Sequence, residues 1–171
     1  MLRTLLALCM LLSFSLQAAP IKELTWEALV PADAPHVAPQ TTPLHDLSKM
    51  GTALGEAGPA AAQSMPNAPV VTALNGENVR LPGFIVPLEV NEEGRTTDFL
   101  LVPYYGACIH VPPPPSNQIV HVSAKQGIKV EELYQPYWIE GTMQVKPSRS
   151  DLADAGYQMA ANKIFIYELP D

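Results

Sequence analysis

Alternating apolar and polar residues dominate the chain from residue 70 onward, and they predict short β-strands. The segment YWIEGTMQV, residues 137–145, alternates with a period of two, so one set of its side chains should face a common core. That set comprises Tyr137, Ile139, Gly141, Met143 and Val145. Further strands are expected in residues 75–90, 97–103, 117–124 and 157–169.

The breaks between these segments predict how the strands connect. Asn75–Gly76 and the stretch NEEGRT, residues 91–96, are expected turns. Pro82–Gly83 lies inside a strand segment and predicts a bulge or sharp bend, because proline cannot donate to a strand ladder. Residues 128–135, IKVEELYQ, predict one or two helical turns. The fold class is therefore mainly β: a small antiparallel OB-like barrel of five or six strands, with a β-sandwich as the alternative.

The N-terminal part has a different pattern and predicts short helices joined by extended chain. Residues 21–31 predict a turn or two of helix ended by Pro31, and residues 42–54 carry leucines at helical spacing. Prolines recur every fourth residue from 31 to 43, which no helix interior tolerates, so an extended strap is expected there. Residues 55–69 are rich in small residues and predict a mobile linker.

The first residues predict export. Arg3 precedes an unbroken apolar run from Leu5 to Leu12, which small residues follow. This run is shorter than the ~20 apolar residues that a membrane span needs, and its flanks are typical of a signal peptide. We expect cleavage near Ala18, a periplasmic location and no integral span after cleavage. The chain then divides into a signal peptide (1–18), a helical, proline-rich strap with linker (19–69) and a β-barrel domain (70–171).

Charge and cysteine content narrow the possible partners. The net charge is −7, and the loss of Arg3 with the signal makes it one unit more negative. An acidic chain without a basic run argues against nucleic acid or anionic lipid as a partner. Loss of Cys9 leaves Cys108 as the only cysteine, so no internal disulfide can form. Cys108 is then an inert core residue, a ligand, a nucleophile or an intermolecular partner.

The segment YYGACIHVPPPPSNQIV, residues 104–120, carries the candidate chemistry. Cys108 and His110 project from the same face if the chain is extended there, and thiolate with imidazole suits zinc or copper. His121 on the following strand is the third candidate. We therefore predict that Cys108, His110 and His121 converge on one metal ion, with an open fourth position.

Several neighbours are expected to orient these ligands or to contact a partner: Tyr104, Pro112, Pro113, Pro114, Pro115, Asn117 and Gln118. The prolines should form a stiff polyproline II segment, and the two amides should act as hydrogen-bond partners of the ligands. His36 and His45 are expected at the surface. Three other interpretations stay open: an inert buried cysteine, a thiol enzyme with Cys108 as nucleophile, and a polyproline segment that docks on a partner protein.

Three segments resemble a bacterial family of exported proteins, the domain of unknown function 3299. They are VRLPGFIVPLE, DFLLVPYYGACIHVPPPPSNQIV and PYWIEGTMQV, and the resemblance covers roughly residues 75–168. The family has no established activity, but the resemblance implies metal handling beside ABC-type transport components under zinc limitation. Its motif positions are Cys108, His110, the four prolines, Asn117 and Gln118. We therefore expect a periplasmic zinc-binding accessory protein that works with an ABC transporter, and leave open whether it also catalyses a reaction.

Overall fold

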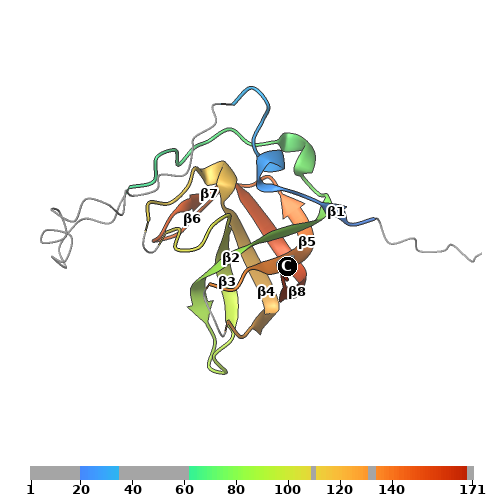
Figure 1. Ribbon diagram of the computed structural model, residues 1–171, viewed down its shortest axis with the longest axis vertical. Coiled ribbons are helices and arrows are strands. Elements are labelled where there is room, and N and C mark those ends of the chain that lie inside the picture. The colour runs from blue at the N-terminus through green and yellow to red at the C-terminus, as the bar shows by residue number, and fades with distance from the viewer. Residues whose placement is uncertain (1–19, 35–61, 109–110, 131–133, 169–171) are drawn as a thin grey trace, which may run out of the picture.

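Five long strands close into a barrel, shown in the computed structural model of Figure 1, which describes residues 20–34, 62–108, 111–130 and 134–168. The strand order is β2-β3-β4-β8-β5, and β5 pairs back with β2. The barrel strands are β2 (Asn78–Val90), β3 (Thr96–Val102), β4 (Val120–Ile128), β5 (Tyr137–Gln144) and β8 (Tyr157–Ile166). The predicted OB-like barrel is thus confirmed.

Six shorter elements flank this barrel in the described residues. They are β1 (Lys22–Glu23), β6 (Ser148–Arg149), β7 (Asp154–Ala155) and three 3-10 helices, η2 (Trp26–Leu29), η4 (Thr72–Leu74) and η5 (Ser116–Gln118). β1 adds to β2 in parallel, and β6 pairs with β7 in a small hairpin at the side of the barrel (Figure 1). One barrel pair also departs from the expected antiparallel arrangement. β8 runs parallel to β4, because all other pairs of this five-stranded barrel are antiparallel and β4 and β8 therefore both have the direction of β2.

The alternation in β5 places its side chains as predicted. Tyr137, Ile139, Gly141 and Met143 are buried, whereas the residues between them are only half-buried. Together with the inward residues of the other barrel strands they form the main apolar core. The sequence NEEGRT also forms the expected hairpin turn, since β2 and β3 are antiparallel and the backbone amide of Arg95 donates to Asn91 Oδ1.

Pro82–Gly83 marks a change of partner within β2 and not the bulge that the sequence suggested. The first half of β2 pairs with β5, ending at Gly83 opposite Tyr137, and the second half pairs with β3, beginning at Phe84. The register irregularities lie further on, between Pro87 and Val90. A Cβ on Gly83 would lie 2.8 Å from the carbonyl oxygen of Val102, so this crossing requires glycine.

A second apolar cluster lies on the outer face of the barrel. β3 contains the consecutive buried residues Phe99, Leu100, Leu101 and Val102, so both of its faces are covered. Leu100 and Val102 face outward and pack with residues of β2, of the chain between β3 and β4, and of the β7 region: Val86, Ala107, Ile119, Ala153 and Ala155. An uninterrupted apolar run is the pattern expected of a strand buried on both sides. The outer cluster positions the loop that carries Cys108.

The predicted N-terminal helix is a single 3-10 turn, η2, which ends before Pro31 as expected. The predicted helix at 42–54, most of the predicted strap and the predicted signal peptide lie outside the described residues. The end of the predicted linker is described and is not free: Gln63 Nε2 donates to the carbonyl of Pro114 at 2.8 Å and to that of Asp154 at 2.9 Å. Of the predicted helix at 128–135, Ile128 belongs to β4 and residues 131–133 are outside the described part.

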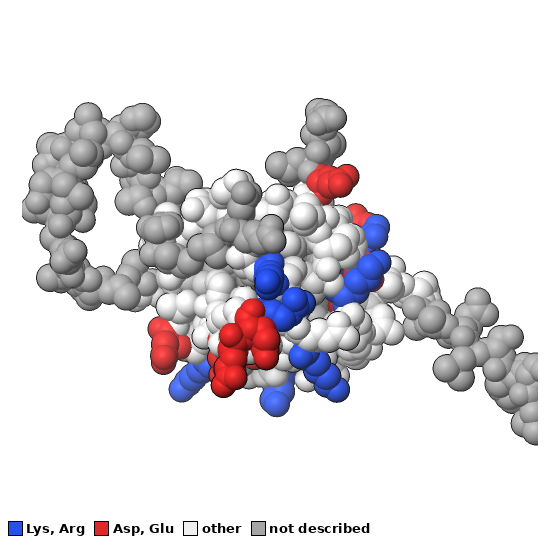
Figure 2. Space-filling view, turned by 90° about the horizontal axis from the view of Figure 1, so that it is seen from below, with Lys and Arg blue, Asp and Glu red and all other residues white. Residues whose placement is uncertain are grey.

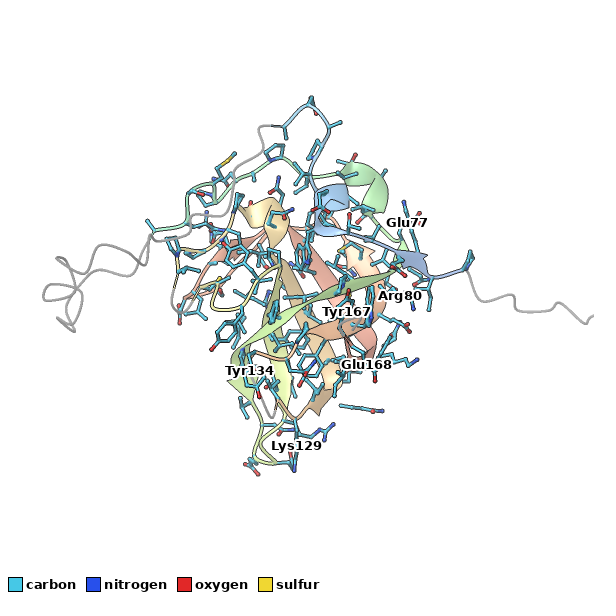
Figure 3. All side chains as sticks on the ribbon, viewed as in Figure 1. Glu77, Arg80, Lys129, Tyr134, Tyr167 and Glu168 are labelled. Carbon is cyan, nitrogen blue, oxygen red and sulfur yellow. The ribbon has the colours of Figure 1, made fainter. Side chains whose placement is uncertain are left out.

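Charged residues and aromatic rings lie on the outer surface. The face in Figure 2 carries Lys and Arg interspersed with Asp and Glu among the described residues, without a continuous field of one sign. Elsewhere, Arg80 pairs with Glu23 and lies 5.0 Å from the ring centroid of Trp138, which packs on Tyr167. Figure 3 labels Arg80 and Tyr167 on this side of the barrel. None of the helices in the described ranges is both long and apolar enough to span a bilayer.

Tyr157 joins the N-terminal segments to the barrel. Its hydroxyl is buried, donates to the carbonyl of Leu29 at 2.7 Å and accepts from the amide of Val71 at 2.7 Å. Burial raises the pKa of this hydroxyl above its ordinary value, and the bond from Val71 partly opposes that rise. Two segments far apart in sequence therefore depend on one buried side chain.

We expect Tyr157→Phe to lower the free energy of unfolding by about 1–3 kcal/mol, because the Leu29 carbonyl and Val71 amide lose their partner in a dry environment. Denaturant unfolding monitored by tryptophan fluorescence measures the change, and Tyr167→Phe on the outer surface is the matched control. Equal stability of the wild type and Tyr157→Phe would show that these bonds contribute nothing net.

Candidate functional site

The loop that carries Cys108 is closed by its own backbone. It follows β3, and the amide of Val111 donates to the carbonyl of Gly106 at 3.2 Å, while Ala107 and Val111 form a bridge. Gly106 has φ 81°, and Cys108 has φ 67°, the only positive φ of a non-glycine residue in the described ranges. Side chains with a Cβ adopt this left-handed region rarely. The loop thus turns sharply at the cysteine.

Cys108 is a partly buried thiol at the edge of the outer apolar cluster. Burial raises the pKa of the Cys108 thiol from its ordinary 9.0 to about 11. The neighbouring Tyr104 hydroxyl also has a raised pKa, first because of burial and then because of its proximity to Cys108. At neutral pH the thiol therefore carries its proton unless a cation approaches it.

His110 lies outside the described residues, so the spacing of Cys108 and His110 remains a prediction from sequence. The same holds for His36 and His45. The residues on either side of positions 109–110 are described: Cys108 comes before them, and Val111 after them closes the loop. Among the described residues, no three His, Cys, Asp or Glu side chains gather closely enough to hold a metal ion.

His121 has partners that the sequence did not suggest. It lies on the outer face of β4, opposite Leu100 of β3. Its Nε2 lies 2.5 Å from Asp98 Oδ1, and its Nδ1 lies 2.9 Å from Ser148 Oγ in β6. Both ring nitrogens are therefore engaged, and metal binding at His121 would have to displace one of these bonds.

Asp98 and Ser148 are the two polar partners of His121 that the sequence interpretation missed. Asp98 pairs with Ser123, two residues along the ladder from the pair Leu100–His121, so Asp98 and His121 are diagonal neighbours on one face. The alternation of β3 and β4 would have predicted that shared face if the register had been known. No sequence pattern pointed to Ser148, because it lies in a strand of two residues after a proline, which is too short to show an alternation.

Asn117 and Gln118 hold the N-terminal segments in place. Asn117 Nδ2 donates to the carbonyl of Pro69 at 2.8 Å, and Gln118 Nε2 donates to that of Trp26 at 2.8 Å. Ser116 adds two bonds to the same segment, through its amide to Met65 and through its hydroxyl from the amide of Ala68. The triplet Ser116–Gln118 is thus a structural anchor in this structure, and these bonds do not reach Cys108.

The four prolines connect the Cys108 loop to this anchor. Pro113 and Pro114 are buried, and the carbonyl of Pro114 accepts a bond from Gln63. Pro115 has φ −52° and ψ 149°, close to polyproline II geometry. The stiff segment fixes where the loop begins and ends, while its buried rings are not displayed for a partner to bind.

A shallow pocket lies beside His121 on the outside of the barrel. Its volume is about 120 Å³. Its polar lining residues are Asp98, His121, Ser123, Gln144 and Gln158. It is formed by residues of β3, β4, β5 and β8.

Comparison with known proteins connects the chain to one family. Residues 26–166 match a protein family of unknown function, DUF3299. A crystal structure of a DUF3299 family protein from Pseudomonas aeruginosa PAO1 is similar, with 58% sequence identity and a TM-score of 0.76. The alignment covers 89% of this chain and 99% of that one. No curated protein matches the sequence. Because the match spans most of the chain, this protein belongs to the DUF3299 family.

Proposed function

We propose that the protein is an exported accessory protein that binds a transition metal ion, zinc in the first instance, through Cys108 and His110, and that it works with an ABC-type transport system. The family assignment supplies no activity, so the support comes from the loop itself. A thiolate and an imidazole two residues apart are a donor set that suits zinc.

The backbone of Cys108 is the observation that carries this proposal. A φ of 67° is strained for any residue with a Cβ, and glycine would occupy the position more easily. Such strain is found where the surrounding structure needs a particular side chain, often at a binding site. The presence of cysteine here, two residues after a glycine with φ 81°, favours a role for its sulfur.

The pKa of Cys108 separates the metal proposal from the thiol-enzyme alternative. A nucleophilic cysteine needs a lowered pKa, whereas burial raises this one to about 11. A bound zinc ion supplies the positive charge that displaces the proton, so a thiol of high pKa can still be a ligand. The thiol enzyme therefore becomes the second candidate.

Two protein ligands leave room for exchange. His121 is already bonded on both nitrogens, so we leave it out of the resident ligand set. Water or groups of a partner protein would complete the coordination, which suits a protein that passes metal on. The burial of Pro113 and Pro114 weakens the alternative in which a polyproline segment docks on a partner. The net charge of −7 favours a cationic cargo.

A zinc titration tests the ligand set. We expect the untagged mature protein to bind one Zn²⁺ with a Kd below micromolar, measured by calorimetry. Cys108→Ser and His110→Ala should each weaken binding at least about tenfold, because each removes a direct ligand. His36→Ala is the matched histidine control and should bind like the wild type.

Two results would contradict the zinc assignment: a wild type that binds no zinc at micromolar concentration, or a Cys108→Ser variant with unchanged affinity. His121→Ala belongs in the same series. A loss as large as that of Cys108→Ser would return His121 to the ligand set.

The reactivity of Cys108 should follow its raised pKa. Since the thiolate is the reacting species, iodoacetamide at pH 8 should modify the folded, metal-free protein about 100-fold more slowly than the urea-unfolded chain. The rate should keep rising with pH toward 11. Mass spectrometry measures the rates. Half-maximal reactivity well below pH 9 would instead move the thiol enzyme to first place.

Export is tested by the mass of the mature chain. Expressed in a Gram-negative host with its own N-terminus, the protein should appear in the periplasmic fraction with a mass that begins at Ala19, because residues 1–18 have the parts of a signal peptide. Replacement of Leu8 by Arg interrupts the apolar run and should retain the protein in the cytosol. Wild-type protein that keeps Met1 in the cytosolic fraction would exclude the periplasmic assignment.

A further inference from the structure

We propose that Ser148, His121 and Asp98 form a hydrolytic site for esters of short acyl groups, with Ser148 as the nucleophile. The site is independent of the Cys108 loop proposed above to bind metal. The three side chains come from β6, β4 and β3, so they are joined only in the folded barrel.

The hydrogen bonds run in the order that nucleophilic catalysis needs. Ser148 Oγ lies 2.9 Å from His121 Nδ1, and His121 Nε2 lies 2.5 Å from Asp98 Oδ1. The carboxylate accepts the proton of Nε2, which leaves Nδ1 without a proton and able to accept that of the serine hydroxyl. The nucleophile, the base and the carboxylate that orients the base are thus in contact. In the usual triad Nε2 of the histidine faces the serine, whereas here Nδ1 does. Such sites are recognised by the roles and geometry of their residues, which this arrangement preserves.

The site is open to solvent on one side, unlike a purely structural link in a core. The side chains of His121 and Asp98 are 22% and 29% exposed. The pocket of about 120 Å³ is lined by both of them, so a bound molecule would lie against the imidazole and the carboxylate. A pocket of this volume holds an acetyl group beside His121, while a long acyl chain would extend beyond it into solvent.

Gln158 provides a donor beside the serine. Its Nε2 donates to the carbonyl of Pro147, the residue before Ser148, over a long distance of 3.3 Å. Gln158 and Gln144 both line the pocket, and they are cross-strand partners on β8 and β5. Side-chain amides can stabilise the negative oxygen of a tetrahedral intermediate. The weak bond to Pro147 is one that such an oxygen would readily replace.

The reaction balances with water as the only co-substrate. Ser148 Oγ forms a bond to the acyl carbon as its proton moves to His121 Nδ1, and the ester C–O bond breaks while that proton passes to the leaving alcohol. Water then gives a proton to Nδ1, its oxygen bonds to the acyl carbon, and the acyl–Oγ bond breaks as the proton returns to Oγ. The products are a carboxylic acid and an alcohol, and no oxidant or reductant is needed.

A fluorophosphonate probe and 4-nitrophenyl esters test this proposal on the mature protein in a Cys108→Ser background, which removes the thiol. We expect peptide mass spectrometry to find the probe on Ser148. We expect acetate hydrolysis to fall at least about 100-fold in Ser148→Ala and His121→Ala, and the octanoate ester to be a poor substrate. Asp98→Asn should lower kcat and shift the pH–rate profile, because the imidazole loses its orienting charge.

Ser150→Ala is the matched control. Ser150 belongs to the same hairpin, but its hydroxyl bonds with Ala153 within the turn, so this variant should keep both labelling and hydrolysis. Circular dichroism confirms that each variant is folded. No labelled serine in the wild type, or hydrolysis by Ser148→Ala at the wild-type rate, overturns the proposal. If Ser148→Ala lowers the melting temperature while the wild type takes no probe, the three residues only tie the hairpin to the barrel and the proposal is likewise overturned.

Discussion

The partner change of β2 is the constraint on which the structure depends. One strand pairs with β5 in its first half and with β3 in its second, and this closes the sheet into a barrel. The change is possible because Gly83 has no Cβ to collide with the backbone of Val102. Closure removes the exposed sheet edges and fixes the register of every other strand. The geometry of both candidate sites therefore depends on this partner change of β2.

The outer apolar cluster explains why both candidate sites lie on the same side of the barrel. Leu100 and Val102 continue the buried surface beyond the barrel wall, and the chain covers them with the Cys108 loop and the β6–β7 hairpin. The loop brings a strained cysteine to the edge of this layer, and the hairpin brings Ser148 to His121. The polar and reactive side chains, Cys108 and Ser148, therefore lie at the edge of the outer apolar cluster, because its centre leaves no room for solvent.

Local pattern predicted the barrel better than it predicted the sites. The period of two in residues 137–145 gave the inward face of β5 correctly, and the apolar stretches gave the number of barrel strands, because both signals depend on neighbours in sequence. The parallel pairing of β4 with β8 and the contact of Asp98 with His121 depend on register, which no single segment encodes. Asn117 and Gln118 were expected to orient the ligands or to contact a partner. Side-chain amides bind any carbonyl within reach, and in this structure they donate to the carbonyls of residues 69 and 26.

The hydroxyl of Tyr157 also sets a limit on when the chain can fold. It bonds to Leu29, 128 positions earlier, so the N-terminal segment has no stable place until nearly the whole polypeptide exists. Contacts of such long sequence separation are made late and slowly, since the intervening chain must lose its freedom first. The N-terminal segment can therefore dock on the barrel only after β8 has been made.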